Sequence, residues 1–176
     1  QFDKEGATYL KEYNNRGQYI AKDKPEHVNM IDYAPICDNV QHLEFFGGEP
    51  LLNITQFELL EHLVESDRSK DITLYYNTNA TNKPTERLQR AWKEFKSIEI
   101  SCSIDGIEDK FEYLRWPGKW STLESTLDYL QNMNLGIPTR IVGNMTTSIT
   151  NVCDTTEIYE WHKERFGEYP YNSMVD

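Results

Sequence analysis

Cysteine is scarce in this sequence, and the positions of the few cysteines exclude two common kinds of site. The 176-residue chain has three, Cys37, Cys102 and Cys153, and none stands close to another. An odd number of widely spaced cysteines is typical neither of a disulfide framework nor of a metal knuckle. Each lies near apolar residues, so we predict reduced, buried thiols that pack as small hydrophobic side chains and hold no metal.

The sequence is also poor in positive charge and in long apolar runs. Lys and Arg number 18 against 29 Asp and Glu, which gives a formal net charge of −11. A chain with this balance is not expected to bind nucleic acid or an anionic membrane through a broad charged face. No apolar run approaches the length of a membrane span, and the first residues do not resemble a signal peptide. We therefore expect a soluble, cytoplasmic protein.

What the chain does contain is a regular alternation of strand and helix patterns. Segments rich in apolar and β-branched residues predict strands near residues 41–46, 72–76, 98–104, 138–145 and 171–175. Segments with apolar residues at helical spacing lie between them, and the pair repeats about every 30 residues, as in right-handed βαβ units. The pattern predicts a single α/β domain. Its parallel sheet lies within residues 25–176, and a polar, weakly helical segment covers residues 1–24.

Smaller features carry expectations of their own. Asn53 followed by Gln56 resembles a capping box at the start of a helix. The four histidines show no ligand spacing, and His162 is expected at the surface or at the edge of the core. Trp116 and Trp120 flank a Pro-Gly turn and are expected to pack rather than to cover a site as a lid.

Small and polar residues gather where the predicted strands end. Gly47-Gly48-Glu49-Pro50 follows the first strand, Asn77-Thr78-Asn79 the second, Ser103-Ile104-Asp105-Gly106 the third, and Gly143-Asn144-Met145-Thr146 the fourth. In the first of these turns the two glycines permit positive φ, the glutamate adds a carboxylate, and the proline fixes φ where the chain leaves. The carboxyl ends of parallel strands share one edge of a sheet, where ligands bind, so the sequence predicts a ligand site on this rim.

Three of these segments, taken in order, resemble the strand motifs of one enzyme superfamily. They are Phe45–Leu51, Tyr76–Thr81 and Ser101–Gly106, the last followed by Tyr113-Leu114-Arg115. The set is similar to the second, third and fourth strand motifs of radical S-adenosylmethionine (SAM) enzymes, and closest to their SPASM and twitch-domain branch. The resemblance covers about residues 40–175. It implies an α/β fold of the incomplete (β/α)6 partial TIM barrel type, whose mouth holds SAM and a [4Fe-4S] cluster. Such enzymes cleave SAM reductively to a 5′-deoxyadenosyl radical, and peptides or proteins are common substrates in this branch.

The resemblance also implies roles for individual side chains. Gly47, Gly48 and Glu49 would bind the amino group of SAM, which needs carbonyl and carboxylate acceptors. Ser103 would contact the ribose, and Arg115 would meet the SAM carboxylate with its guanidinium fork. The full set of expected SAM-binding residues is Gly47, Gly48, Glu49, Pro50, Asn79, Ser103, Asp105, Arg115 and Asn151, and no catalytic residue is assigned.

Plainer roles stay open for four of these residues. Arg115 fits a surface ion pair, and Ser103 fits a hydroxyl bonded to the backbone at the edge of the core. Asn79 fits a turn, and Asn151 fits a helix cap.

One element of the family pattern is absent from the chain. The family's cluster is held by three cysteines in a C-x3-C-x2-C loop after the first strand, and no such loop precedes Gly47. We therefore expect an internal piece of a longer radical SAM enzyme. The full-length protein would bind SAM and the cluster, whereas this piece alone is expected to bind neither and to be inactive. An incomplete barrel leaves a sheet edge unpaired, so self-association through that edge is also expected.

Two other functions remain open from the sequence. One is a cluster-free module that keeps the barrel for SAM binding or as a scaffold. The other is a hydrolase that uses Glu49 and Asp105 as a carboxylate pair. The hydrolase is less favoured, because neither carboxylate stands in a clearly apolar stretch that would raise its pKa.

Overall fold

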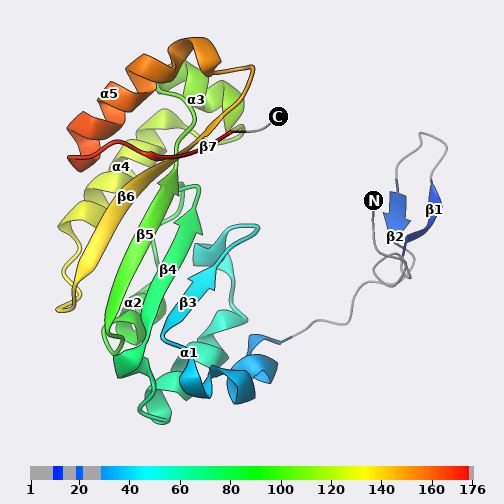
Figure 1. The fold of residues 1–176 in the computed structure, drawn as a ribbon, viewed down its shortest axis with the longest axis vertical. Coiled ribbons are helices and arrows are strands. Elements are labelled where there is room, and N and C mark those ends of the chain that lie inside the picture. The colour runs from blue at the N-terminus through cyan, green and yellow to red at the C-terminus, as the bar shows by residue number, and fades with distance from the viewer. Residues whose placement is uncertain (1–9, 14–18, 22–28, 175–176) are drawn as a thin grey trace.

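Five parallel strands form the central sheet of the computed structural model, which describes residues 10–13, 19–21 and 29–174 (Figure 1). The strands are β3 (His42–Phe45), β4 (Thr73–Thr78), β5 (Ser97–Ser103), β6 (Thr139–Thr147) and β7 (Tyr171–Met174). They lie side by side in chain order, and every neighbouring pair is parallel. Together with the connecting helices, this is the arrangement of an incomplete βα barrel, and the predicted fold class is confirmed.

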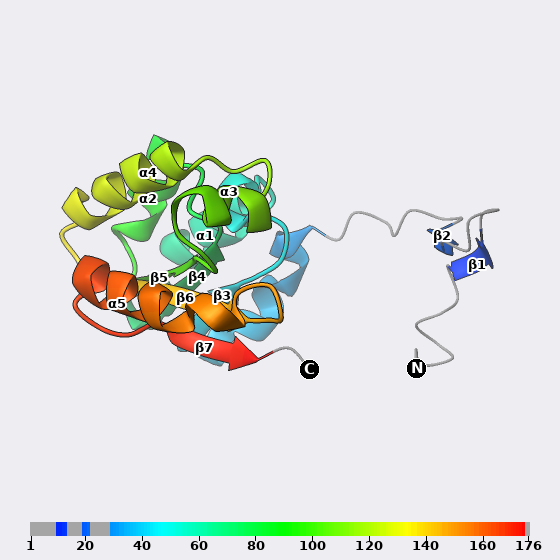
Figure 2. The same cartoon turned by 90° about the horizontal axis from the view of Figure 1, so that it is seen from above.

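Helices connect the successive strands. The α-helices are α1 (Gln56–Glu65), α2 (Glu86–Trp92), α3 (Glu108–Leu114), α4 (Trp120–Asn132) and α5 (Thr155–Phe166). Short 3-10 helices are η1 (Met30–Asn39), η2 (Pro50–Leu52), η3 (Ser69–Asp71) and η4 (Val152–Asp154). Figures 1 and 2 show the α-helices ranged along one side of a curved sheet.

The helix-covered face of the sheet carries the hydrophobic core. Alternate residues of a strand point to opposite faces, and on β4 the buried residues are Leu74, Tyr76 and Thr78. The Tyr76 ring stacks on Phe45 of β3 with centroids 4.7 Å apart and meets the edge of Trp92 in α2 at 5.0 Å. These contacts fix the side of β4 that faces the helices.

The opposite face of the sheet is polar. The strand register aligns Glu44, Tyr75, Glu99 and Arg140 across four strands. Arg140 forms ion pairs with Glu99 at 2.8 Å and with Glu168 at 2.7 Å. Polar side chains therefore form a row across this face of the sheet.

The N-terminal segment differs from the weakly helical structure expected for residues 1–24. Its described residues form two strands, β1 (Leu10–Tyr13) and β2 (Tyr19–Ala21), which pair in antiparallel fashion. The remainder of this segment lies outside the described residues. A strand pair depends on a partner several residues away along the chain, which a helix-periodicity argument does not register.

The capping box expected at Asn53 and Gln56 is absent. Helix α1 begins at Gln56, and its N-cap position is Thr55. Gln56 is instead fully buried, where its amide donates to the Pro50 carbonyl at 2.6 Å and its oxygen accepts from the Tyr76 hydroxyl at 2.6 Å. Because the Gln56 side chain bonds to Tyr76 of β4 and to the Pro50 carbonyl, it does not cap α1.

Candidate ligand site at the carboxyl rim

The turn after β3 has a backbone that only glycine adopts easily. Gly47 and Gly48 have φ angles of +80° and +56°, in the left-handed region. A Cβ placed on either glycine would meet nothing within 4 Å. Glycine is therefore required by conformation rather than by crowding, and the space beside the turn is open to a ligand.

Glu49 ties this turn to the end of β4. Its Oε1 accepts hydrogen bonds from the Leu51 N–H at 3.1 Å and from the Thr78 hydroxyl at 2.6 Å. Its Oε2 accepts from the Asn79 N–H at 2.9 Å. An ionised carboxylate has about four acceptor positions, so three donors leave capacity for one more. The side chain is fixed in place and can still accept a bond from a cation.

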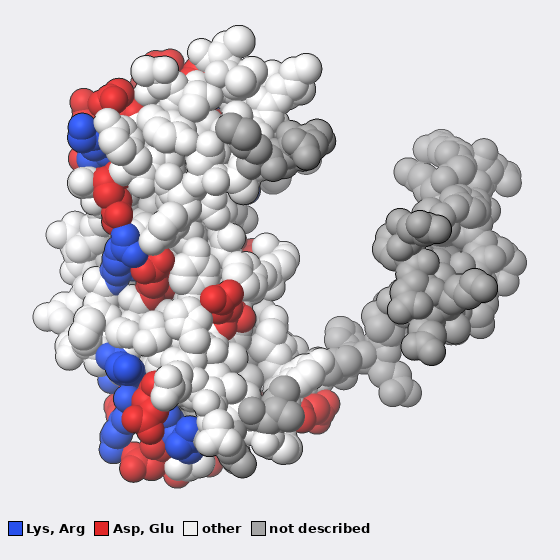
Figure 3. Space-filling view, in the orientation of Figure 1, with Lys and Arg blue, Asp and Glu red and all other residues white. Residues whose placement is uncertain are grey.

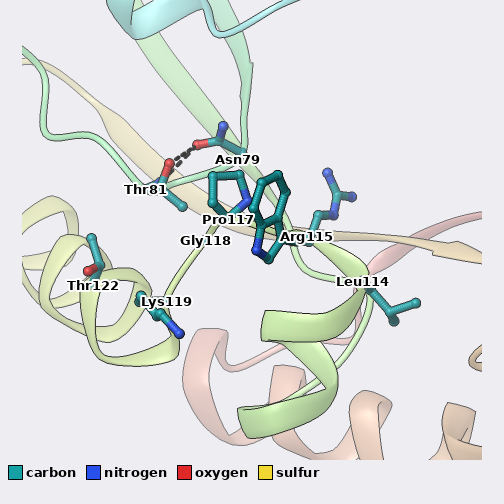
Figure 4. Close-up of a pocket in the computed structure, with 9 residues that line it drawn as sticks. Asn79, Thr81, Leu114, Arg115, Pro117, Gly118, Lys119 and Thr122 are labelled. Carbon is teal, nitrogen blue, oxygen red and sulfur yellow. Dashed lines mark hydrogen bonds between the residues drawn. The ribbon is translucent and has the colours of Figure 1, made fainter.

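Asn79 stands at the end of β4 and lines a cavity. Its Oδ1 accepts from the N–H and the hydroxyl of Thr81 at 2.9 and 2.6 Å, which is the turn expected of an asparagine here. The cavity has a volume of about 510 Å³, within the range of small-molecule sites. Figure 4 shows the residues that line it: Asn79, Thr81, Leu114, Arg115, Trp116, Pro117, Gly118, Lys119 and Thr122.

Trp116 and Trp120 have different surroundings. Trp120 packs against Phe111 and Trp161, with ring centroids 5.6 and 5.2 Å apart, as expected. Trp116 is 83% exposed on the wall of the cavity, so the prediction that it packs is wrong. A second hollow of about 440 Å³ shares Thr81 and Thr122 with the first, and no acidic residue lines either one.

Ser103 ends β5 on the polar face of the sheet. Its hydroxyl donates to the Asn77 Oδ1 of β4 at 2.7 Å, rather than to the backbone. The register pairs Thr78 with Cys102 on these two adjacent strands, and Asn79 and Ser103 are the residues that come next along the chain. The structure thus brings the ends of β4 and β5 together through side chains as well as through the backbone.

Asp105 and Arg115 form an ion pair between the end of β5 and the end of α3. The other oxygen of Asp105, Oδ1, accepts from the Thr146 N–H of β6 at 2.8 Å. The Arg115 side chain is 28% exposed, and its buried Nε has no hydrogen-bond partner among the described residues. The ion pair expected as a plain alternative for Arg115 is thus present, and it leaves several guanidinium N–H groups unused.

Asn151 is 1% exposed, and its polar atoms are bonded to the protein itself. Its amide donates to the carbonyls of Asp105 and Thr146, both at 2.9 Å, and its oxygen accepts from the Ser148 N–H at 2.7 Å. It occupies the N-cap position of η4 but makes no capping bond with its side chain. Asn151 therefore joins the loops after β5 and β6.

The expected site residues fall into two groups on the rim. Glu49 and Asn79 form one with the Gly47-Gly48 turn and Pro50, and Asp105, Arg115 and Asn151 form the other. Ser103 stands between them. Sequence reasoning did not assign the residues that hold each group, Thr78 and Asn77 on one side and Thr146 and His162 on the other. Thr78 could have been found from the sequence, since it stands inside the motif Asn77-Thr78-Asn79.

The described residues do not fit an iron-sulfur cluster. Among them, no group of three or more His, Cys, Asp or Glu side chains could hold a metal ion. Cys37 and Cys102 are buried, as predicted, and burial raises the pKa of the Cys102 thiol to about 12. Cys153 is exposed, so that part of the prediction is wrong, because it lies in η4 on the rim rather than in the core.

Acidic and basic side chains are interspersed on the face shown in Figure 3, where they gather along one side of the molecule. That face has no broad basic field of the kind that binds nucleic acid. In the part of the chain that the structure describes, no helix has the length and apolar character needed to cross a membrane.

Comparison with known proteins identifies the family. The model of the radical SAM superfamily matches residues 5–161 of this chain. The chain therefore belongs to the radical SAM superfamily, and the resemblance inferred from its strand motifs is confirmed at that level.

A relative of this chain is a protein of Methanocaldococcus jannaschii that is described only as uncharacterized. The two are 38% identical over 127 residues, which make up 70% of this chain and 42% of the relative. The chain thus spans less than half the length of that relative. No solved structure matches this chain significantly.

Proposed function

We propose that this rim binds SAM and that the whole protein uses SAM for radical chemistry on a peptide or protein in the cytoplasm, as in the SPASM and twitch-domain branch. A pair of opposite charges on one rim supports the proposal most directly. Glu49 is fixed by three donors and can accept one more hydrogen bond. Arg115 uses one edge for Asp105 and has further donors beside the cavity. The methionine end of SAM carries an ammonium and a carboxylate, which need one partner of each kind.

In this proposal each group on the rim holds a different part of SAM. The Gly47 and Gly48 carbonyls and the Glu49 carboxylate accept bonds from the ammonium. The Ser103 hydroxyl binds the ribose, and the Arg115 guanidinium binds the carboxylate. When bound beside a [4Fe-4S] cluster, SAM supplies a 5′-deoxyadenosyl radical after reductive cleavage. The described residues do not fit that cluster, so its ligands would belong to another part of the whole protein, and this chain alone would not cleave SAM.

The binding proposal is tested by titration calorimetry of the whole protein with SAM. Replacing Glu49 by Gln or Arg115 by Met removes a charge-assisted hydrogen bond, so affinity falls by roughly tenfold or more. Glu86→Gln and Arg90→Met are the matched controls, because these exposed side chains pair with each other on α2, away from the rim. Unchanged affinity in both site variants contradicts the proposal.

A cluster-free module is the second candidate, favoured by the absence of a metal-binding group among the described residues. Anaerobic iron-sulfur reconstitution of the whole protein separates the two. The iron content of one cluster, together with release of 5′-deoxyadenosine from SAM, supports the enzyme. SAM binding without iron supports the module. A carboxylate-pair hydrolase gains no support from the site, because the two carboxylates belong to different groups of the rim: Glu49 is bonded to the end of β4, and Asp105 to Arg115 and Thr146.

A further inference from the structure

His162 of α5 lies directly on the backbone of β6. The residue is 0% exposed. A Cβ placed on Gly143 would stand 1.9 Å from His162 Nδ1 and 2.4 Å from Cε1, so only glycine leaves room for the ring. The imidazole also stacks on Phe166, with centroids 5.6 Å apart, and meets the edge of Trp161 at 5.3 Å. Packing on three sides fixes the position of the ring.

The surroundings of the ring decide which of its nitrogens carries the proton. His162 Nε2 lies 3.1 Å from the carbonyl oxygen of Ile104, and a carbonyl can only accept. Nε2 therefore donates. Nδ1 is buried and has no hydrogen-bond partner among the described residues, so a second proton there would find no acceptor. Burial lowers the pKa of His162, against smaller opposing effects of the Ile104 hydrogen bond and the Asp105 charge. The ring is a neutral imidazole with one N–H aimed at the end of β5.

The carbonyl that His162 holds belongs to the residue just before Asp105. The Ile104 N–H also donates to the Asn144 carbonyl of β6 at 2.7 Å, so both backbone polar groups of Ile104 are held. Asp105 is then fixed by Thr146, by Asn151 and by its ion pair with Arg115. We call His162, Ile104, Asp105 and Asn151 the rim bracket. It reaches from α5 to the guanidinium of Arg115.

We propose that His162 is a positioning residue, which fixes Ile104 and Asp105 and thereby aims the free edge of Arg115 at the carboxylate of the ligand. The inference rests on the SAM site proposed above and extends it. It makes Asp105 and Asn151 supports of the site instead of ligand contacts, since their bonds tie the loops after β5 and β6 to each other and to Arg115.

The first test compares SAM with decarboxylated SAM, which lacks the group that Arg115 would bind. The wild-type whole protein is expected to bind SAM roughly tenfold more tightly or better. His162→Phe keeps the ring volume but removes the donor, so the ratio of the two affinities falls toward one. His162→Gln keeps an N–H donor and restores the ratio. Leu63→Ala on α1 is the control for lost stability, because this core side chain belongs to a helix that packs on η1, α2 and η3, and its ratio stays at the wild-type value. A wild-type ratio in His162→Phe, or an equal loss in Leu63→Ala, overturns the inference.

A second measurement does not depend on SAM. If the bracket acts as one unit, the fall in melting temperature of the double variant His162→Phe, Asp105→Asn is smaller than the sum of the two single falls. If the falls in melting temperature are additive, the proposal that these residues act as one unit is overturned. If the wild type binds both ligands equally, the carboxylate contact in the proposed function is overturned, and with it the ligand role of His162. A non-additive cycle would in that case still show that His162 is coupled to Asp105, so the two failures are distinguishable.

Discussion

The two halves of the rim hold one charged side chain each, by different means. On the β3–β4 half, Glu49 is held directly by Leu51, Thr78 and Asn79, all within 30 residues of it. On the β5–β6 half, Arg115 is held by Asp105, which in turn depends on Thr146, Asn151 and the histidine of α5. One half is a local turn, whereas the other is a chain of contacts that ends on a remote helix.

Because the two charged side chains are held in different ways, substitutions at different places should disturb each half of the rim. Damage to the first half should come only from residues that touch the Gly-Gly-Glu turn or the end of β4. Damage to the second should come also from α5, whose His162 does not line the cavity. The two halves also use glycine differently: Gly47 is needed for its φ angle, and Gly143 for space.

The largest effect is expected from Gly143→Ala. The added Cβ would fall 1.9 Å from His162 Nδ1, so the ring or β6 must move. Overpacking of this kind costs about 3 kcal/mol, measured as the free energy of unfolding in urea. Gly47→Ala meets no atom and suffers only the strain of a positive φ, about 1 kcal/mol. Equal costs at the two positions would contradict the contrast between crowding and conformation.

A control shows whether the cost at Gly143 arises from the imidazole. In the double variant Gly143→Ala, His162→Ala, the new methyl group occupies part of the space that the ring has left. The double variant should therefore lose less stability than the two single variants together. Additive losses would place the strain somewhere other than the contact with the ring.

The next largest effect is expected at Thr78, which supports the other half. Its hydroxyl donates to Glu49 at 2.6 Å and accepts from the Ala80 N–H at 3.0 Å. Thr78→Val preserves the shape but leaves both partners short of a bond, which costs about 2 kcal/mol in the free energy of unfolding. Thr139→Val is a matched control, because the bond of this partly buried hydroxyl within the described residues is a local one, to the Ile137 carbonyl. A loss no larger than that of the control would show that the Glu49 contact adds little.

The pH dependence of stability tests the β5–β6 half separately, because that half depends on the buried His162. The pKa of His162 is lower in the folded chain than its ordinary value of 6.5. Below pH 6.5 the unfolded chain therefore binds the extra proton first, and stability falls as the pH drops toward the folded pKa. His162→Phe should remove this part of the pH dependence, seen as a smaller difference between urea midpoints at pH 7 and at about pH 5.5. The same slope in wild type and variant would show that His162 is not the group responsible.

The sequence predicted the parts of this molecule that depend on local pattern. The strand before Gly47 alternates polar His42 and Glu44 with apolar Leu43 and Phe45, the strand from Thr73 is rich in aromatic and β-branched residues, and parallel order follows from the helices between them. The rim was predictable because its residues stand in short motifs at strand ends. The resemblance of those motifs to radical SAM enzymes also gave the family correctly.

The supports of the site could not be predicted in the same way. His162 contacts a carbonyl 58 residues earlier, and Gln56 contacts a tyrosine 20 residues later, so no window of sequence contains both partners. A signal that was available is Gly143 in the middle of a strand, where a glycine often marks the close approach of another group. The antiparallel strands near Leu10 and Tyr19 were missed because their pairing, too, lies outside a helical pattern.

The smallest effect on stability, but a clear one on assembly, is expected at the edge next to the Glu49 half. Within the described residues β3 and β7 are the outer strands, and β3 pairs only with β4. The Thr73 N–H donates to the Gln41 carbonyl, so by alternation the backbone groups of Glu44 point away from β4.

Glu44→Pro therefore removes one outward N–H without breaking the β3–β4 ladder, and the fold should be little affected. Leu43→Pro, one residue earlier, removes an N–H that faces β4 and should destabilise the sheet. We expect the wild-type chain to self-associate through this edge, with sedimentation coefficients that rise with concentration, and Glu44→Pro to weaken that rise. A wild-type chain that sediments as a monomer at every concentration would show that the β3 edge does not pair.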